Sequence, residues 1–298
     1  MSYRDIEKTF QINSKALGHY SSDALTSGSY GKNTYDFCLN NKFAFENIYE
    51  GFRADAIYYF LKRGIAWHSG IRHNQHYYPE NHLCSSQISC INYLFYFIDK
   101  PEYLKELLKS LDFDVSEVLP IDLDLNLYDY IYGGKKPYLA FEWIGDENYL
   151  NELYRGKVAP KQIRTRGANY TSADFIIRYK DSEGKIKILL SEWKYTEYYS
   201  PENKKYSKSK SGTDRYEKIY KPFLDDPGCP IKMLTGLSHE DLFFDPFDQL
   251  MRLQLLAKEM ETNKEMGADN VKLLLVVPEK NVDYLNKITS KNLKNTGK

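Results

Sequence analysis

Residues 171–194 read TSADFIIRYK-DSEG-KIKILLSEWK, and this stretch decides the fold class. Two apolar, β-branched runs flank a short polar segment that contains a glycine, a pattern typical of a β-hairpin. A three-residue loop at 182–184 would end on a glycine in the left-handed region and would pair Asp181 with Lys185. The stretch therefore predicts two antiparallel strands in a defined register.

This register predicts which side chains meet. Asp174 lies opposite Glu192, and opposed residues of an antiparallel pair share a face with Cβ atoms about 4.5–5.5 Å apart. Because side chains alternate along a strand, Lys194 joins Glu192 on that face and Trp193 points to the other. A loop one residue longer or shorter would put the two carboxylates on opposite faces of the hairpin.

Two carboxylates and an amine on one face suit magnesium-dependent cleavage of phosphodiesters. Mg²⁺ binds through one or two carboxylates, here Asp174 and Glu192, and keeps several waters. The ion lowers the pKa of a bound water and stabilises charge on phosphoryl oxygens. Lys194 would orient or deprotonate the attacking water, and the Trp193 carbonyl would add a ligand. We expect Mg²⁺ as the cofactor, with Mn²⁺ able to replace it.

The alternative is a surface hairpin in which Glu192 and Lys194 are merely solvated, because Glu-x-Lys alone occurs by chance in many proteins. Two observations favour the functional interpretation. Glu192, Trp193 and Lys194 come at the end of a segment whose apolar run, 186–190, is typical of a buried strand. The upstream acid, Asp174, also falls at the register that brings it opposite Glu192.

A helix is predicted to begin near residue 246. Asp245 is expected as its N-cap and Pro246 at its first position, with Asp248 favourable to the helix dipole. Its apolar positions follow helical spacing: Phe247, Leu250, Met251, Leu253, Leu256, Ala257 and Met260. Gln254 breaks this stripe and must find hydrogen bonds, either to a water or phosphate near the metal or to the backbone.

Three further elements complete the pattern. Residues 271–277 form an apolar run stopped by Pro278, which predicts a buried central strand. Residues 138–143 predict another strand ahead of the hairpin. A helix starting near Ser85 carries an apolar face made of Cys84, Ile88, Ile91, Phe95 and Ile98. The predicted order is helix, three strands, helix, strand.

This order, with an acid on the second strand and Glu-x-Lys on the third, resembles the PD-(D/E)XK nuclease superfamily. The resemblance implies an α/β fold with a restriction-endonuclease-like core, α-β-β-β-α-β, in which helices flank a mixed central sheet. It also implies that Asp174 and Glu192 are metal ligands and Lys194 the catalytic lysine. Gln254 would match the glutamine that some members place on the second core helix.

A narrower resemblance is to bacterial proteins described as restriction endonucleases. It rests on 82–87 with Asn92, on 141–143 and on 166–174, and the likeness spans about residues 65–280. One departure is Ala173, where the proline that gives the superfamily its name would stand. The resemblance implies a restriction or defence endonuclease that acts on double-stranded DNA, with a homodimer suited to cutting both strands.

Several polar residues are candidates for supporting roles. Glu142 would be a further acid at the metal if its strand turns that face inward. Gln87 and Ser86, near the start of a helix, would hydrogen-bond a phosphate, or a serine there would only cap the helix. Histidines near Cys84 raise a zinc alternative, although their spacing fits no common module: His68, His73, His76 and His82.

Charge is balanced overall but segregated along the chain. The 41 basic and 41 acidic residues leave no net charge, which argues against nucleic-acid binding by the whole surface. Lys161, Arg164 and Arg166 belong to a basic segment that leads into Asp174, and we expect them to contact DNA phosphates. A second basic stretch, 204–221, is either another contact or a solvated loop.

The expected organisation is a mainly helical N-terminal elaboration at 1–80, a nuclease-like core at 81–280, and a C-terminal helix or tail at 281–298. No secretory signal or membrane-spanning run is visible, so a cytoplasmic protein with reduced cysteines is expected. Two other functions stay open: a catalytically inactive nucleic-acid-binding protein with the nuclease fold, and a repair or mobile-element nuclease.

Overall fold

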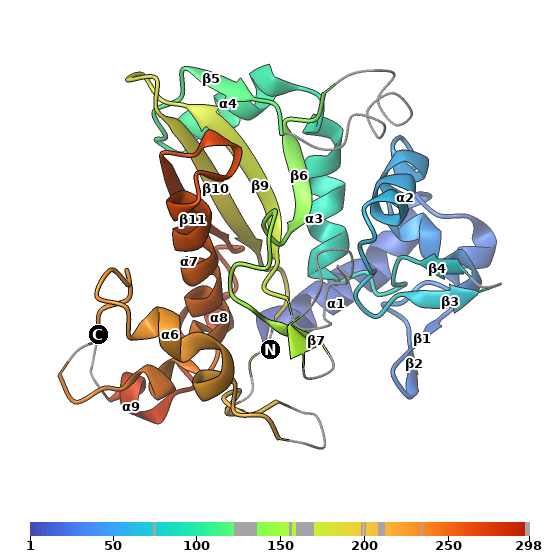
Figure 1. Cartoon of the computed structure of the whole chain (residues 1–298). Helices are drawn as coiled ribbons and strands as arrows, with labels where there is room; N and C mark the ends of the chain where they lie inside the picture. Colours follow the sequence, from blue (N-terminus) through green and yellow to red (C-terminus); the bar gives the residue numbers. More distant parts are fainter. Residues whose placement is uncertain are drawn as a thin grey trace.

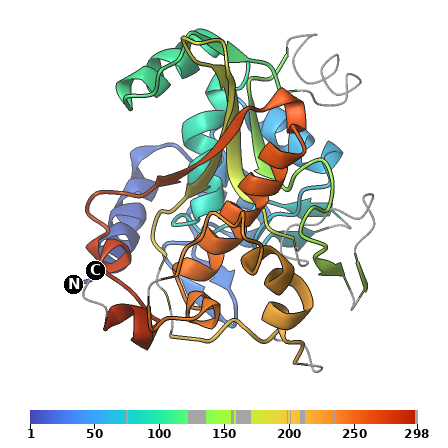
Figure 2. The same ribbon diagram turned by 60° about the vertical axis from the view of Figure 1, so that its left-hand side comes forward.

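A computed structural model shows a central β-sheet with helices on both faces (Figures 1 and 2). The structure describes residues 1–73, 76–121, 136–154, 157–158, 170–197, 199, 201–207, 212–233 and 235–295. Within these ranges, no helix has both the length and the apolar character that crossing a bilayer requires.

The central sheet is built around the predicted hairpin. Its strands are β5 (Glu117–Leu119), β6 (Leu139–Trp143), β9 (Ala173–Lys180), β10 (Ile186–Trp193) and β11 (Asn270–Val276). The order is β11-β10-β9, and β5 and β6 pair with different halves of β9. Only the pairing of β10 with β11 is parallel, so the sheet is mixed. The predicted α/β class with a mixed sheet is confirmed.

The hairpin register is the predicted one. Ile186 pairs with Lys180, and the ladder continues without a shift to Ser191 opposite Phe175. The Asp181 amide donates to the Lys185 carbonyl at 3.0 Å, so the loop is 182–184. Its last residue, Gly184, has φ +81°, the left-handed conformation that this loop requires.

Helices α3 (Ser86–Leu94) and α7 (Phe247–Thr262) cover opposite faces of the sheet (Figure 1). Consecutive side chains of β10 show this directly. The Trp193 indole donates to Ser89 on α3 at 3.2 Å, whereas Glu192 meets Gln249 on α7 at 2.5 Å. Trp193 therefore points away from the face that carries the predicted site, as expected.

The start of α3 agrees with the sequence pattern. Ser85 is the N-cap, and its hydroxyl accepts a hydrogen bond from the Ile88 amide at 3.2 Å. The predicted apolar face is buried along its whole length, at Cys84, Ile88, Ile91, Phe95 and Ile98. This face packs on the sheet, where the rings of Phe95 and Phe141 stack 5.9 Å apart.

Two details of the C-terminal part differ from expectation. Within the described sheet β11 is an edge strand and not a buried central one, and Leu275 is 38% exposed. An apolar run does not distinguish a buried strand from one covered on part of its surface. Asp245 is not the N-cap of α7, because Pro246 holds that position and the Asp245 carboxylate instead binds Lys204 Nζ at 2.6 Å.

The N-terminal 80 residues combine helices with small hairpins. They contain α1 (Tyr3–Ser14), β1 (Gly28–Tyr30), β2 (Asn33–Tyr35), α2 (Arg53–Lys62), β3 (Ile71–His73) and β4 (His76–Tyr78). Ile48 and Phe60 from this part belong to the same hydrophobic cluster as the sheet residues Ile176 and Leu189. The predicted division of the chain into domains stays a prediction.

The remaining elements lie between and beyond the core strands. They are α4 (Pro101–Ser110), β7 (Leu153–Tyr154), β8 (Lys157–Val158), α6 (Lys221–Leu224), α8 (Val282–Leu285) and α9 (Lys291–Lys294). A π-helical turn at Tyr216–Tyr220 leads directly into α6. The described C-terminal residues thus form two short helices.

Candidate active site

Asp174 and Glu192 lie side by side on the α7 face of the hairpin. The register that pairs Ser191 with Phe175 places these two acids opposite each other at the next position. Asp174 Oδ2 accepts a hydrogen bond from the Trp193 amide at 2.7 Å. Both side chains are buried, with 7% and 2% of their residue surface exposed. The hairpin thus brings together the two predicted metal ligands.

Lys194 completes this group. Its Nζ lies 2.5 Å from Glu192 Oε1, and its amide donates to the Val276 carbonyl of β11 at 2.8 Å. Burial by itself lowers the pKa of Lys194, but the negative charges of Glu192 and Asp174 outweigh it and raise the pKa above the usual value. The amine is therefore a cation, able to neutralise charge and to orient a water.

Gln249 joins the group from the first turn of α7. Its Nε2 donates to Glu192 Oε1 at 2.5 Å, and its Oε1 accepts from Lys194 Nζ at 2.7 Å. One amide therefore contacts both charged groups and holds them in one arrangement. The sequence pattern instead predicts Gln254 in this role. Gln254 is half-buried, and its side chain has no hydrogen bond among the described residues.

A topological signal in the sequence would have selected Gln249. Because β10 and β11 are parallel, α7 must begin near the carboxyl end of β10, where Glu192 and Lys194 lie. A glutamine in the first turn then reaches the site. Gln254 lies five residues further on and projects about 140° away around the helix axis.

A second buried polar cluster supports the start of α7. Asp248 is 1% exposed and lies between two guanidinium groups, 3.4 Å from Arg215 Nη1 and 3.3 Å from Arg252 Nε. Glu152 accepts from the Thr171 amide at 2.6 Å and from its hydroxyl at 2.7 Å. The hydroxyl of Thr171 also accepts from Arg252 Nη1 at 3.5 Å, so the cluster ties α7 to the beginning of β9.

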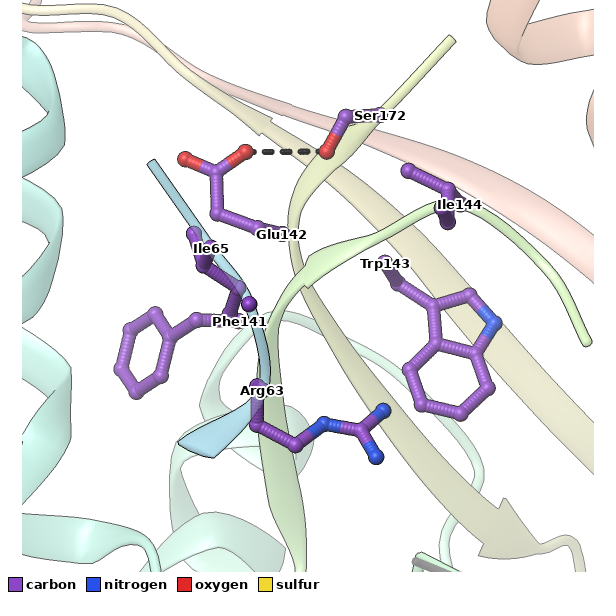
Figure 3. A pocket seen from close by; sticks show the side chains of 8 residues that line it. Arg63, Ile65, Phe141, Glu142, Trp143, Ile144 and Ser172 are labelled. Atoms are coloured by element: carbon purple, nitrogen blue, oxygen red, sulfur yellow. Dashed lines mark hydrogen bonds between the residues drawn. The ribbon is translucent and has the colours of Figure 1, made fainter. Parts of the chain in front are cut away.

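Glu142 lies next to Asp174 on the neighbouring strand, because the residue pairs on either side of it join β6 to β9. Its backbone has φ +52°, which turns the side chain away from the regular strand direction. Figure 3 shows the carboxylate directed at Ser172, whose hydroxyl donates to it at 2.9 Å. Gln87 Nε2 donates to the other carboxylate oxygen at 2.8 Å.

Ser86 and Gln87 use their side chains to hold acids. The Ser86 hydroxyl donates to Glu197 Oε1, while Gln87 donates to Glu142. Glu197 Oε2 also accepts from the Tyr195 amide at 2.6 Å, and its charge contributes to the raised pKa of Lys194. Two consecutive residues of α3 thus contact acids on both flanks of the hairpin.

The predicted phosphate contacts Lys161, Arg164 and Arg166 lie outside the described residues. The second basic stretch is described in part, and several of its cations pair with acids of the same fold. Lys204 binds Asp245 at 2.6 Å, Lys205 binds Glu240 at 2.8 Å and Asp214 at 3.4 Å, and Arg215 binds Asp248. These ion pairs reduce the positive charge that 204–221 can offer to DNA.

The zinc alternative finds no support in the part of the chain that the structure describes. Within it, no three or more His, Cys, Asp or Glu side chains gather so as to hold a metal ion. His82 Nδ1 accepts from the Cys84 amide at 3.1 Å, an ordinary structural contact. The side chains of His73 and His76 lie outside the described residues.

Residues 12–297 match the family model described as "Restriction Endonuclease associating with ARP". No curated protein and no solved structure matches the chain.

Proposed function

Because the chain belongs to the family of restriction endonucleases associating with ARP, we propose that it is a Mg²⁺-dependent endodeoxyribonuclease of the PD-(D/E)XK type. The family is a nuclease family, so DNA is the expected substrate. We assign the protein to restriction or defence, acting on double-stranded DNA in the cytoplasm. Catalysis is assigned to Asp174, Glu192 and Lys194.

The observation that carries this proposal is the grouping of two buried carboxylates and a buried ammonium at the end of one hairpin. Lys194 Nζ lies 2.5 Å from Glu192 Oε1, and Asp174 occupies the facing strand. Burying such charges is costly unless they are paired and hydrogen-bonded. A cluster of this kind with perturbed ionisation is a candidate for catalysis.

The residues present fit a magnesium ion. Asp174 and Glu192 supply the hard oxygens that Mg²⁺ prefers, and two carboxylates are enough for an ion that keeps its waters. The immediate surroundings also carry an excess of acids over the single amine of Lys194, since Glu142 and Glu197 lie on either flank. That negative excess favours a divalent cation. When bound, the ion would polarise the phosphoryl oxygens and acidify a water.

The chain's own residues divide the remaining work. Lys194, held as a cation, would orient the attacking water and offset the charge that develops on the phosphate. Gln249 keeps the Lys194 amine against Glu192 through its two hydrogen bonds. Asp174 is held by the Trp193 amide, so its position depends on the hairpin and not on a mobile side chain.

The proposed core is α3, β6, β9, β10, α7 and β11, in that order along the chain. This is the helix, three strands, helix, strand sequence of the superfamily that the chain resembles, with β5 as an additional short strand. The family description names an association with ARP, and we propose the same association for this chain. A homodimer would allow both strands of a symmetric site to be cut.

The test is cleavage of supercoiled and linear DNA by the purified full chain with Mg²⁺, with Mn²⁺ and with EDTA. Asp174→Ala and Lys194→Ala should abolish metal-dependent cutting. The matched control is Lys185→Ala, which removes an exposed lysine at the turn end of the same hairpin and should cut normally. Loss of cutting in the control, or cutting retained by Lys194→Ala, would contradict the assigned site. Binding without cutting by wild type would support the inactive alternative.

A further inference from the structure

A cavity of about 370 Å³ lies beside the candidate site, and the catalytic assignment does not use it. Its volume is within the usual range for small-ligand pockets, about 300–1,000 Å³. The walls come mainly from α1, β1, the segment between β4 and α3, the first turn of α3 and the segment that follows β10. The residues that line it include Arg4, Tyr30, Glu80, His82, Ser86, Gln87 and Glu197.

Arg4 lines this cavity, and no described residue forms a hydrogen bond or an ion pair with its guanidinium. Its Nε is buried and has no hydrogen-bond partner, and the described part of the chain offers the side chain no ion pair. Buried donors are almost always satisfied, because an unsatisfied one costs roughly 1–3 kcal/mol and more for a charged group. A ligand in the cavity that carries an acceptor atom would give the rest of the guanidinium the partner that the described residues do not supply.

One wall of the cavity is aromatic. The rings of Tyr30 and His82 lie 4.7 Å apart at an interplanar angle of 59°. Burial, together with the positive charge of Arg4, lowers the pKa of His82 to about 4, so the imidazole is neutral at pH 7. Tyr30, which is half-buried and backed by the neutral His82 ring, thus offers an aromatic face to a planar group, in the manner of proteins that stack bases on side-chain rings.

Two acids, Glu80 and Glu197, also line the cavity. Glu80 is 3% exposed and bonds the Ser85 hydroxyl, and Glu197 accepts from Ser86. Negative charges here disfavour a bare phosphate. They are good acceptors for the exocyclic amino group of a base, while a guanidinium such as that of Arg4 binds ring nitrogens and carbonyl oxygens. Thymine lacks the exocyclic amino group.

The cavity is joined to the candidate site through α3. Gln87 lines the cavity and donates to Glu142, which flanks Asp174. Ser86 lines it as well and donates to Glu197, three residues after Lys194. Two consecutive residues of α3 therefore line the cavity and contact acids beside the candidate site.

We propose that this cavity receives an unstacked base of the DNA substrate, one that carries an exocyclic amino group, adjacent to the phosphate at the candidate site. This rests on the proposed function, and it names the substrate class: DNA with a base that is unpaired or easily extruded. Extrusion costs a few kcal/mol from a paired duplex and least from a bulge. The protein should accordingly prefer bulged DNA.

The test measures binding, not cutting. Fluorescence anisotropy of the full chain in EDTA would compare a paired hairpin DNA with hairpins that carry one bulged dG, dC, dA or dT. We expect hairpins with a bulged dG, dC or dA to bind at least tenfold more tightly than the paired hairpin. The hairpin with a bulged dT should show a smaller increase in affinity. Arg4→Gln and Tyr30→Ala should each remove most of this preference. Arg4→Lys, which keeps the positive charge, should retain part of the preference that Arg4→Gln loses.

The control is Arg72→Gln, which removes an exposed guanidinium from β3, outside the cavity. It should keep the preference. Equal affinity for bulged and paired DNA, or an equal weakening of all DNAs by Arg4→Gln, would overturn the base pocket. If circular dichroism shows that Arg4→Gln does not fold, the test of the base pocket rests on Tyr30→Ala.

The EDTA arm separates this inference from the proposed function. Cutting by wild type with Mg²⁺ but no bulge preference in EDTA would overturn the cavity alone. A bulge preference that depends on Arg4, without cutting on any DNA, would overturn the nuclease assignment alone.

Discussion

Replacing Lys194 by methionine tests the charge arrangement of the candidate site. Methionine keeps the length of the side chain but removes the ammonium, which contacts Glu192 Oε1 at 2.5 Å and Gln249 Oε1 at 2.7 Å. Hydrogen bonds to charged groups contribute about 1.5–3 kcal/mol each, and breaking a buried ion pair costs about 3–5 kcal/mol. We expect Lys194→Met to lose about 3–5 kcal/mol of unfolding free energy at pH 8.

The loss should depend on pH in a definite direction. The pKa of Lys194 is raised by folding, so its contribution in the wild type is fully present below the unfolded pKa of about 10.4 and constant between pH 5 and 8. Any change with pH in the stability difference between wild type and variant therefore comes from Glu192, whose buried carboxylate has lost its cationic partner in the variant. Protonation at lower pH neutralises that charge, so the loss should be smaller at pH 5 than at pH 8.

The assay is urea unfolding of both proteins at the two pH values, without metal. The double variant Lys194→Met, Glu192→Met removes the stranded charge and should recover about 1–3 kcal/mol relative to the single variant. A single variant as stable as wild type at pH 8, or a loss that grows as the pH falls, would refute the buried ion pair.

Three further outcomes are expected. Gln249→Leu should slow cleavage at least tenfold, whereas Gln254→Leu, on the same helix, should cut like wild type; equal rates in kinetic assays would remove Gln249 from the site. Mg²⁺ at ten times its Kd should raise the free energy of unfolding of wild type by about 1.4 kcal/mol and leave that of Asp174→Asn unchanged, as measured by thermal and urea unfolding. An equal gain in that variant would place the ion elsewhere. Gly184→Ala should destabilise by about 1–2 kcal/mol through its backbone alone, since φ is +81° and no atom lies within 4 Å of the added Cβ. A more stable alanine variant in urea would show that the loop had changed shape.

Local patterns in the sequence predicted the hairpin and the first core helix well. The glycine at 184 and the alternation of β9 and β10 suffice to set the register, because a shift of one residue would expose the apolar face. Ser85 begins α3 because a serine at that position satisfies a backbone amide that would otherwise lack a partner. Both features depend on neighbours in the chain.

Helix α7 shows what a local pattern does not predict. The apolar spacing predicts the helix, but it does not say which end approaches β10. Asp245 resembles an N-cap in sequence, yet Lys204, 41 residues earlier, binds its carboxylate. Capping preferences describe a local equilibrium, and a distant ion pair can replace the capping contact.

The sequence by itself determined the α/β class, the hairpin register and the presence of Asp174, Glu192 and Lys194 on one face. The class follows from helical and strand spacing, and the register and the shared face follow from strand alternation and one turn. Only the tertiary structure decided that Gln249 joins them, that Ser86 and Gln87 hold Glu197 and Glu142, and that Arg4 lines a cavity beside the site. These contacts join residues far apart in the chain, and their geometry depends on how helices pack against the sheet, which no local pattern encodes.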